Sequence, residues 1–196
     1  MYQRTKRIAF SVCTAVALAA LSACSGLPSI HAGGPSAVTR SLPAGTMSTE
    51  ALQALDSHGK LPALDWSAEL KGEDKDGNGI RDDVDAILRS GTSGPAWPVK
   101  LDSAEQRAAA QQLAVAYQKV ATLNAADGAA VTAVRKDLTA ALECAQARLH
   151  ITEETMLTSS LEVYTFNTTS RQKAKEKFWS AVGGSLVVKS NEASCG

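Results

Sequence analysis

Oxygen-bearing side chains recur at alternate positions in a segment that begins at Asp74 and ends at Asp85. Calcium in proteins takes about six to eight oxygen ligands, from carboxylates, amides, main-chain carbonyls and water. The segment offers each of these protein groups in turn. The expected ligands are the side chains of Asp74, Asp76, Asn78, Asp82 and Asp85 and the main-chain carbonyl of Ile80. The sequence therefore predicts a calcium-binding loop over residues 74–85.

The composition of the loop also favours a bound cation. Gly79, at the sixth position, permits a sharp turn. Five aspartates within twelve residues repel one another unless a cation neutralises them. Asp82 is expected to bind directly or through a water molecule, and Asp85 from the first turn of a helix over about 83–88. The alternative is a solvated turn rich in Asp and Asn, in which Asp82 or Asp83 caps that helix.

This pattern resembles the EF-hand loop at positions one, three, five, six, nine and twelve. It departs from the EF-hand at Asp85, where glutamate is usual, and at Arg81, where a hydrophobic residue is usual. Gly72, just before the loop, argues against a continuous entering helix. The loop is closer to thrombospondin type 3 repeats and to single calcium loops of secreted bacterial proteins. No His or Cys within the loop offers a nucleophile or base, so the ion is expected to be structural.

The N-terminus has the pattern of a secretory signal. A short basic start through Arg7 precedes residues 8–21, which carry no charge. That apolar run is shorter than the roughly 20 residues of a comfortable spanning helix. The run ends in Leu21-Ser22-Ala23-Cys24.

These four residues resemble the lipobox of bacterial lipoproteins. The resemblance implies cleavage before Cys24, a diacylglycerol thioether on its sulfur and an acyl chain on its new amine, which together anchor the chain in a membrane. Ser25 follows, and the absence of Asp there implies sorting to the outer membrane of a Gram-negative envelope. The alternatives are an ordinary signal peptide with a chance cysteine, or an uncleaved anchor.

The charge of the chain argues against nucleic acid as a partner. The 20 basic and 20 acidic residues cancel, but three basic residues and no acid lie in the first 23 residues. Without that segment 17 basic residues face 20 acidic ones, so the remaining chain is slightly acidic. A basic surface is the usual footprint of nucleic-acid binding.

The remaining cysteines and histidines point to structure more than to catalysis. Cys144 and Cys195 form an even pair, and we predict a disulfide between them, against the alternative of two free thiols. His31, His58 and His150 are scattered. No zinc-hydrolase, nucleophile-elbow or phosphate-loop motif is present, and His150 is expected to complement a helix C-terminus.

Three parts are expected along the chain: a signal peptide (1–23), a lipidated cysteine with a flexible tether (24–60) and a folded domain (61–196). The first part of the tether, residues 25–49, is rich in Gly, Pro, Ser and Thr and has a single charge. A short helix with Ser48 or Thr49 as its cap is expected at its end. The domain is expected to be small and mainly α.

Helical periodicity places an antiparallel hairpin at the centre of this domain. Its first helix opens at Asp102 or Ser103 with a capping box, and its second runs from about Ala125 to Leu149. Two more helices are expected, over about 155–164 and from near Ser170 to the glycines at 183 and 184, followed by a short extended piece. The expected buried stripes of the hairpin are Ala109, Leu113, Tyr117 and Val120 in its first helix, and Val131, Val134, Leu138, Leu142, Ala145 and Leu149 in its second.

The function predicted from these features is a non-enzymatic, calcium-stabilised envelope lipoprotein that presents a helical domain to an unidentified protein partner. One alternative is an envelope enzyme acting on cell-wall material through acids such as Glu153 and Glu154. Another is an inhibitor or immunity-like binding protein. A pocket lined by Trp66, Trp97 or Trp179 is a further alternative to their packing in the core. A basic cluster is expected to form a solvated helix face, with contact to anionic lipid or a partner as the alternative; it comprises Arg171, Lys173, Lys175 and Lys177.

Overall fold

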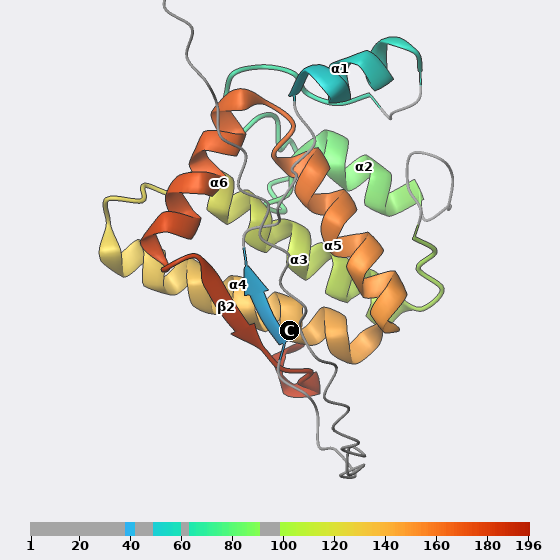
Figure 1. Ribbon diagram of the computed structural model, residues 1–196. Coiled ribbons are helices and arrows are strands. Elements are labelled where there is room, and N and C mark those ends of the chain that lie inside the picture. Colours follow the sequence, from blue (N-terminus) through green and yellow to red (C-terminus); the bar gives the residue numbers. More distant parts are fainter. Residues whose placement is uncertain (1–37, 42–48, 60–62, 91–98) are drawn as a thin grey trace, which may run out of the picture. The chain divides into compact units, whose positions relative to one another are not determined.

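The computed structural model describes residues 38–41, 49–59, 63–90 and 99–196, which form a mainly helical domain (Figure 1). The chain divides into two units, residues 1–33 and 34–196, and all described residues belong to the second. The elements are β1 (Val38–Ser41), α1 (Thr49–Ser57), α2 (Asp82–Ser90), α3 (Ala104–Thr122), α4 (Gly128–Arg148), α5 (Ile151–Thr165), α6 (Thr169–Ala181), β2 (Ser185–Val188) and a 3₁₀ turn, η1 (Glu192–Ser194). The predicted α class is confirmed. Cys24 and Trp97 lie outside the described residues.

The capping box predicted at the start of α3 is present. The Ser103 hydroxyl accepts a hydrogen bond from the amide of Gln106, and the Gln106 side chain accepts one from the amide of Ser103. These bonds satisfy donors that the first turn of a helix otherwise leaves unpaired. The whole predicted stripe of α3 is buried.

Helix α4 begins three residues later than predicted because Asp127 acts as its N-cap. The Asp127 carboxylate accepts hydrogen bonds from the amides of Ala129 and Ala130. The whole predicted stripe is buried, with its last residue, Leu149, as the C-cap of α4. The two helices pack against each other as the predicted hairpin, and the Lys119 ammonium lies 2.6 Å from the Asp137 carboxylate across it.

Helix α5 begins four residues before its predicted start. His150 therefore does not only follow the end of α4; it is the N-cap of α5, and its amide donates a hydrogen bond to the Glu153 carboxylate. This start was not predicted because the first turn of α5 has no buried apolar residue: Ile151 is exposed, and the buried residue there is Glu154. The end of α6 is as predicted, since Gly183 and Gly184 adopt positive φ directly after it.

Helix α3 forms the centre of the domain. It packs against α2, α4, α5 and α6, and Figure 1 shows α5 crossing in front of it. Tyr117 of α3 meets Phe166 edge to face, with ring centroids 5.7 Å apart. Trp179 is buried in the core, and Trp66 is partly buried and packs against this core. For these two side chains the structure therefore supports core packing rather than the lining of a ligand pocket.

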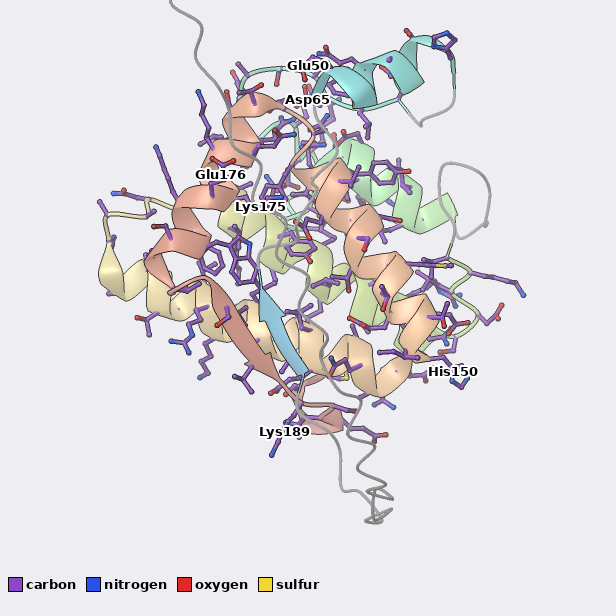
Figure 2. All side chains as sticks on the ribbon, viewed as in Figure 1. Glu50, Asp65, His150, Lys175, Glu176 and Lys189 are labelled. Atoms are coloured by element: carbon purple, nitrogen blue, oxygen red, sulfur yellow. A yellow bond between two sulfur atoms is a disulfide. The ribbon has the colours of Figure 1, made fainter. Side chains whose placement is uncertain are left out.

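The basic residues of α6 do not form a single solvated face. Arg171 and Lys175 are buried, while Lys173 and Lys177 are exposed. Figure 2 shows Lys175 on the side of α6 that faces α5, where its ammonium lies 2.9 Å from the Glu162 carboxylate. The predicted basic cluster is therefore split between the core and the surface.

A short antiparallel sheet joins distant parts of the chain. Strand β1 pairs with β2 so that Val38 lies opposite Val188 and Ser41 opposite Ser185. The Trp66 indole also donates a 2.7 Å hydrogen bond to Asp56 of α1. The folded unit thus includes segments before residue 61 that the sequence assigned to the tether.

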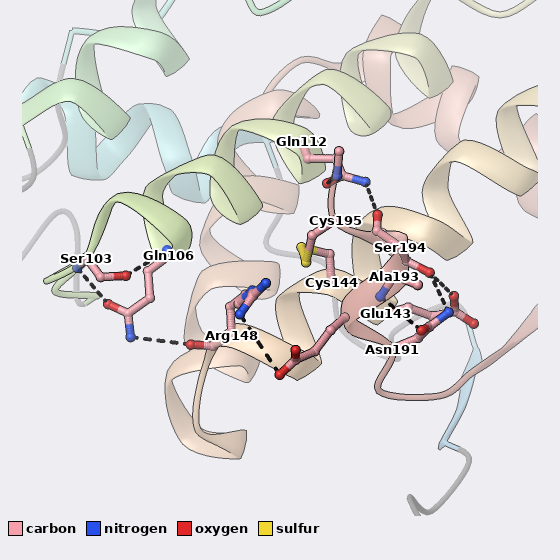
Figure 3. Close-up of a disulfide and its surroundings, with 12 residues drawn as sticks. Ser103, Gln106, Gln112, Glu143, Cys144, Arg148, Asn191, Ala193, Ser194 and Cys195 are labelled. Carbon is pink, nitrogen blue, oxygen red and sulfur yellow. Dashed lines mark hydrogen bonds and ion pairs between the residues drawn. A yellow bond between two sulfur atoms is a disulfide. The ribbon is translucent and has the colours of Figure 1, made fainter.

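The C-terminal segment is fixed to the helical hairpin (Figure 3). A disulfide joins Cys144 of α4 to Cys195, as the even pair of cysteines predicts. Next to it the Ser194 hydroxyl donates to the Glu143 carboxylate and the Gln112 side chain donates to the Ser194 carbonyl. The end of the chain is thereby attached to both α3 and α4.

Candidate metal centre

The segment before α2 is a tight turn held by its own polar side chains. Gly77 and Gly79 have φ of 70° and 82°, which side chains with a Cβ rarely adopt. The Asp74 carboxylate accepts a hydrogen bond from the amide of Gly79, and the Asn78 side chain accepts one from the amide of Ile80. Residues 63–73, which lead into the loop and are described, contain no helix, in agreement with the prediction made from Gly72.

Three of the predicted ligands converge. Asp74, Asp76 and Asp82 each place a carboxylate oxygen within 4.8 Å of those of the other two. Asp82 is the first residue of α2, and its carboxylate also accepts a hydrogen bond from the amide of Lys75 across the loop. Three carboxylates this close repel one another, and a shared cation would offset that repulsion.

Asp85 extends this cluster from the first turn of α2. The residue is 1% exposed, and its carboxylate accepts a 3.1 Å hydrogen bond from the side-chain amide of Asn78. The same side-chain amide also donates to the Asp76 carboxylate. Asn78 therefore connects the predicted ligands at positions three and twelve. The loop thus brings three of the predicted ligand side chains together, and Asn78 connects Asp85 to one of them, Asp76.

Two buried carboxylate oxygens in this cluster accept no hydrogen bond from any described residue. They are Oδ1 of Asp74 and Oδ1 of Asp85. A buried acceptor without a partner is costly, so each such atom requires a physical explanation. All of these donors are oxygen atoms, which a hard cation prefers as ligands, so the chemistry of the donor set fits calcium.

Ile80 attaches the loop to the core. Its side chain is buried with that of Val84 in the main hydrophobic cluster, and its amide donates to Asn78. The side chain thus fixes the position of the residue whose carbonyl was predicted as a ligand.

Arg89 and Lys75 pair with acidic residues in the loop or directly beside it. The Arg89 guanidinium contacts the carboxylates of both Asp76 and Asp85. The Lys75 ammonium lies 2.7 Å from Glu73, and this hydrogen bond raises the pKa of Lys75. Sequence reasoning missed the role of Arg89, although its spacing of four from Asp85 on a helix was a usable signal.

Arg81, at loop position eight, is a buried structural residue. It is 1% exposed, and its guanidinium makes a two-pronged pair with Asp83, with N–O distances of 2.5 and 2.8 Å. Its other bonds go to the main-chain carbonyls of Tyr164 and Thr165 at the end of α5. Arg81 therefore links the loop to α5, a role that its sequence neighbours do not indicate.

A second buried arginine continues this polar network. Arg171 is 0% exposed and contacts the Asp65 carboxylate, the Asp65 and Glu69 carbonyls and the Asn167 side chain. Burial, with the nearby charge of Arg81, lowers the pKa of Arg171. Burial acts to raise the pKa of Asp65, but hydrogen bonds from Ser67 and the pairing with Arg171 outweigh it, so that this pKa is lowered. Figure 2 shows Asp65 near the start of α6.

An open hollow of about 440 Å³ lies between this network and the metal loop. It is lined by Asp65, Ser67, Glu69, Gly72, Glu73, Arg81, Asp82 and Asp83. The lining is rich in carboxylates, and Asp82 is shared with the metal cluster.

The acids named for an enzyme site have structural partners instead. Glu153 accepts a hydrogen bond at the start of α5, and Glu154 is fully buried and accepts one from Thr158. His58 is exposed, and its ring lies 2.6 Å from the carbonyl of Ala54. None of these residues contributes to the acidic group around Asp74.

No protein-family model, curated protein or solved structure matches this chain. Across the described ranges, no helix has both the length and the apolar character needed to span a bilayer.

Proposed function

We propose that the chain is a calcium-binding lipoprotein of the cell envelope whose ion stabilises a helical domain presented to a protein partner. The convergence of Asp74, Asp76 and Asp82 carries the calcium assignment. The buried, unpaired oxygens of Asp74 and Asp85 support it independently, because they require a partner that no described residue supplies.

The chemistry of the donors favours calcium over other metals. Every expected ligand atom is an oxygen, and soft or borderline metals such as zinc prefer sulfur and imidazole nitrogen. Magnesium demands a small, nearly ideal octahedral shell, whereas calcium accepts irregular shells with more ligands. A loop with six candidate oxygen donors suits the larger ion.

We assign the ion a structural role. The loop is attached to the core through Ile80 and to α5 through Arg81, so closing the loop around an ion would also stabilise the packing of α2 and α5. A ligand that binds only the folded state raises its stability by mass action. Within the described residues, Glu153 and Glu154 have the structural partners given above, and no observation favours the enzyme alternative.

Thermal unfolding in calcium and in chelator tests this role. Calcium is expected to raise the melting temperature of the wild-type domain and of an Asp137→Ala control, which loses an exposed carboxylate on α4. Replacement of Asp74 and Asp76 together by alanine is expected to abolish the gain. Identical melting of the wild type in calcium and in chelator would contradict the proposal.

The envelope assignment is supported by the sequence alone. The basic start, the apolar run and Leu21-Ser22-Ala23-Cys24 predict lipidation of Cys24. Expression in a Gram-negative host with labelled palmitate is expected to label the full chain and not its Cys24→Ala variant. Equal labelling of both would refute the lipid anchor.

Presentation of the domain to a partner is tested from the membrane fraction. Among the described residues Ile151 and Met156 are large apolar side chains exposed on α5. Capture of the solubilised lipoprotein is expected to recover one partner in a fixed ratio. A hydrolytic activity of the purified chain without such a partner would instead favour the enzyme alternative.

A further inference from the structure

Arg89 contacts two carboxylates that belong to the predicted calcium shell. It lies in the last turn of α2, and its side chain is 60% exposed. One guanidinium nitrogen lies 3.2 Å from Oδ2 of Asp76 and also contacts Oδ2 of Asp85. The same nitrogen thus connects loop positions three and twelve.

These contacts involve Oδ2 of Asp76 and of Asp85, two carboxylates that belong to the predicted calcium shell, while Oδ1 of Asp85 accepts no hydrogen bond from any described residue. A guanidinium is always charged at physiological pH and forms strong, charge-assisted hydrogen bonds to carboxylates. A divalent ion beside Asp76 and Asp85 would repel it, so the two cations cannot share these carboxylates at full strength. Arg89 can withdraw without unfolding α2, because its side chain is largely exposed to solvent.

We propose that Arg89 is an internal competitor of calcium. Its guanidinium neutralises Asp76 and Asp85 when calcium is scarce, which keeps the loop folded, and it leaves them when calcium binds. Arg89 therefore lowers the affinity of the loop for calcium. It also reduces the difference in stability between the calcium-free and the calcium-bound protein. This inference rests on the proposed calcium site.

Calcium titration by calorimetry tests the competition. The variant is Arg89→Gln, and the matched control is Arg135→Gln, which removes the same charge from an exposed position on α4. Calcium is expected to bind Arg89→Gln about three- to tenfold more tightly than the wild type, in line with the loss of two partly exposed ion-pair contacts. The control is expected to keep the wild-type affinity. In chelator, Arg89→Gln is expected to melt below both other proteins.

The outcomes separate the two proposals. If the wild type binds calcium and Arg89→Gln binds it no more tightly, the competition is refuted and the calcium site stands. If neither protein binds calcium, the site itself is refuted, and the competition with it. Binding by Arg89→Gln alone would support both.

Nuclear magnetic resonance of the wild-type protein gives a second readout that requires no variant. The guanidinium nitrogens of Arg89 are expected to show hindered rotation in chelator and free rotation in calcium. Unchanged signals on addition of saturating calcium would refute the displacement of Arg89.

Discussion

At the scale of single residues, Asp65 and Arg171 form a charged pair that connects the segment before the metal loop to α6. The guanidinium lies 2.8 Å from the Asp65 carboxylate and is fully buried. Two hydrogen bonds from Ser67 also reach this carboxylate. The ionised form of Asp65 is therefore stabilised in the fold more than in the unfolded chain.

This pair predicts a loss of stability in acid. The pKa of Asp65 lies below its ordinary value of 3.8, so its contribution is complete above that pH and is lost as the pH falls through the lower, folded-state pKa. Asp65→Asn is expected to be less stable than the wild type near neutral pH, by about 1.5–3 kcal/mol for bonds to a charged group. Urea unfolding at decreasing pH should show this difference shrink below pH 3.8. A difference in unfolding free energy between the two proteins that stays constant in acid would contradict the stabilisation of ionised Asp65 by the fold.

Arg81 predicts a larger effect because its guanidinium is buried together with two main-chain carbonyl partners. Arg81→Met removes the cation from the Asp83 carboxylate, which keeps hydrogen bonds from the amides of Asp65 and Val84, and it removes the Arg81 donor from the Tyr164 and Thr165 carbonyls. The expected cost is about 3–5 kcal/mol of unfolding free energy, as for other broken buried pairs. Urea unfolding measures it, with the exposed Arg135→Met as the control. A cost below about 1 kcal/mol, typical of an exposed pair, would contradict the buried role.

At the scale of elements, the segment that leads into the loop depends on one glycine. Gly72 has φ of 66°, and a Cβ placed on it would lie 2.7 Å from the Asp65 carboxylate and would also overlap the Arg81 side chain. Gly77, within the loop, has φ of 70°, but nothing lies within 4 Å of an added Cβ. An alanine at Gly77 would therefore test backbone strain alone, and an alanine at Gly72 would test backbone strain together with steric overlap.

Alanine at these two positions is expected to have unequal effects. Gly77→Ala should cost about 1–2 kcal/mol, the penalty of a left-handed residue with a side chain. Gly72→Ala carries the same penalty and in addition displaces the buried pairs of Arg81 and Asp65. Urea unfolding in chelator measures both variants without a contribution from calcium. Equal costs would show that Arg81 and Asp65 can move aside freely.

The elements that the sequence predicted well are those whose signals are local. The cap at Ser103, the spacing of buried residues in α3 and α4, and the glycines after α6 all lie within a few turns of the structure they determine. The pairing of β1 with β2 was not predicted, because four residues of mixed polarity at 38–41 do not indicate a strand partner near residue 185.

The same distinction applies within the metal centre. The predicted ligands lie within twelve consecutive positions, so the convergence of Asp74, Asp76 and Asp82 could be predicted from spacing. The burial of Arg81 and Arg171 could not, since their partners at Tyr164 and Asp65 lie 83 and 106 positions away. Charged residues are rarely buried, and only the fold reveals the groups that compensate them.

At the scale of the whole domain, a disulfide and a set of buried arginine pairs hold the ends of the helices in place. The disulfide between Cys144 and Cys195 closes a sequence separation of 51 residues, for which chain entropy gives about 4 kcal/mol. Helices α5 and α6 are instead held to the loop region by noncovalent contacts: Arg81 contacts the end of α5, and Arg171 of α6 pairs with Asp65. The stability of that side is therefore expected to depend on whether the loop is ordered.

Hydrogen exchange in calcium and in chelator tests this dependence. Calcium should slow exchange in the loop and also at the end of α5, because Arg81 connects the loop to the carbonyls of Tyr164 and Thr165. The start of α6 should follow through Arg171 and Asn167. The C-terminal segment near Cys195 serves as an internal control, since the disulfide fixes it independently of the ion. A change confined to residues 73–85 would show that the arginine pairs do not transmit the effect of calcium, and the ion would then stabilise its own loop alone.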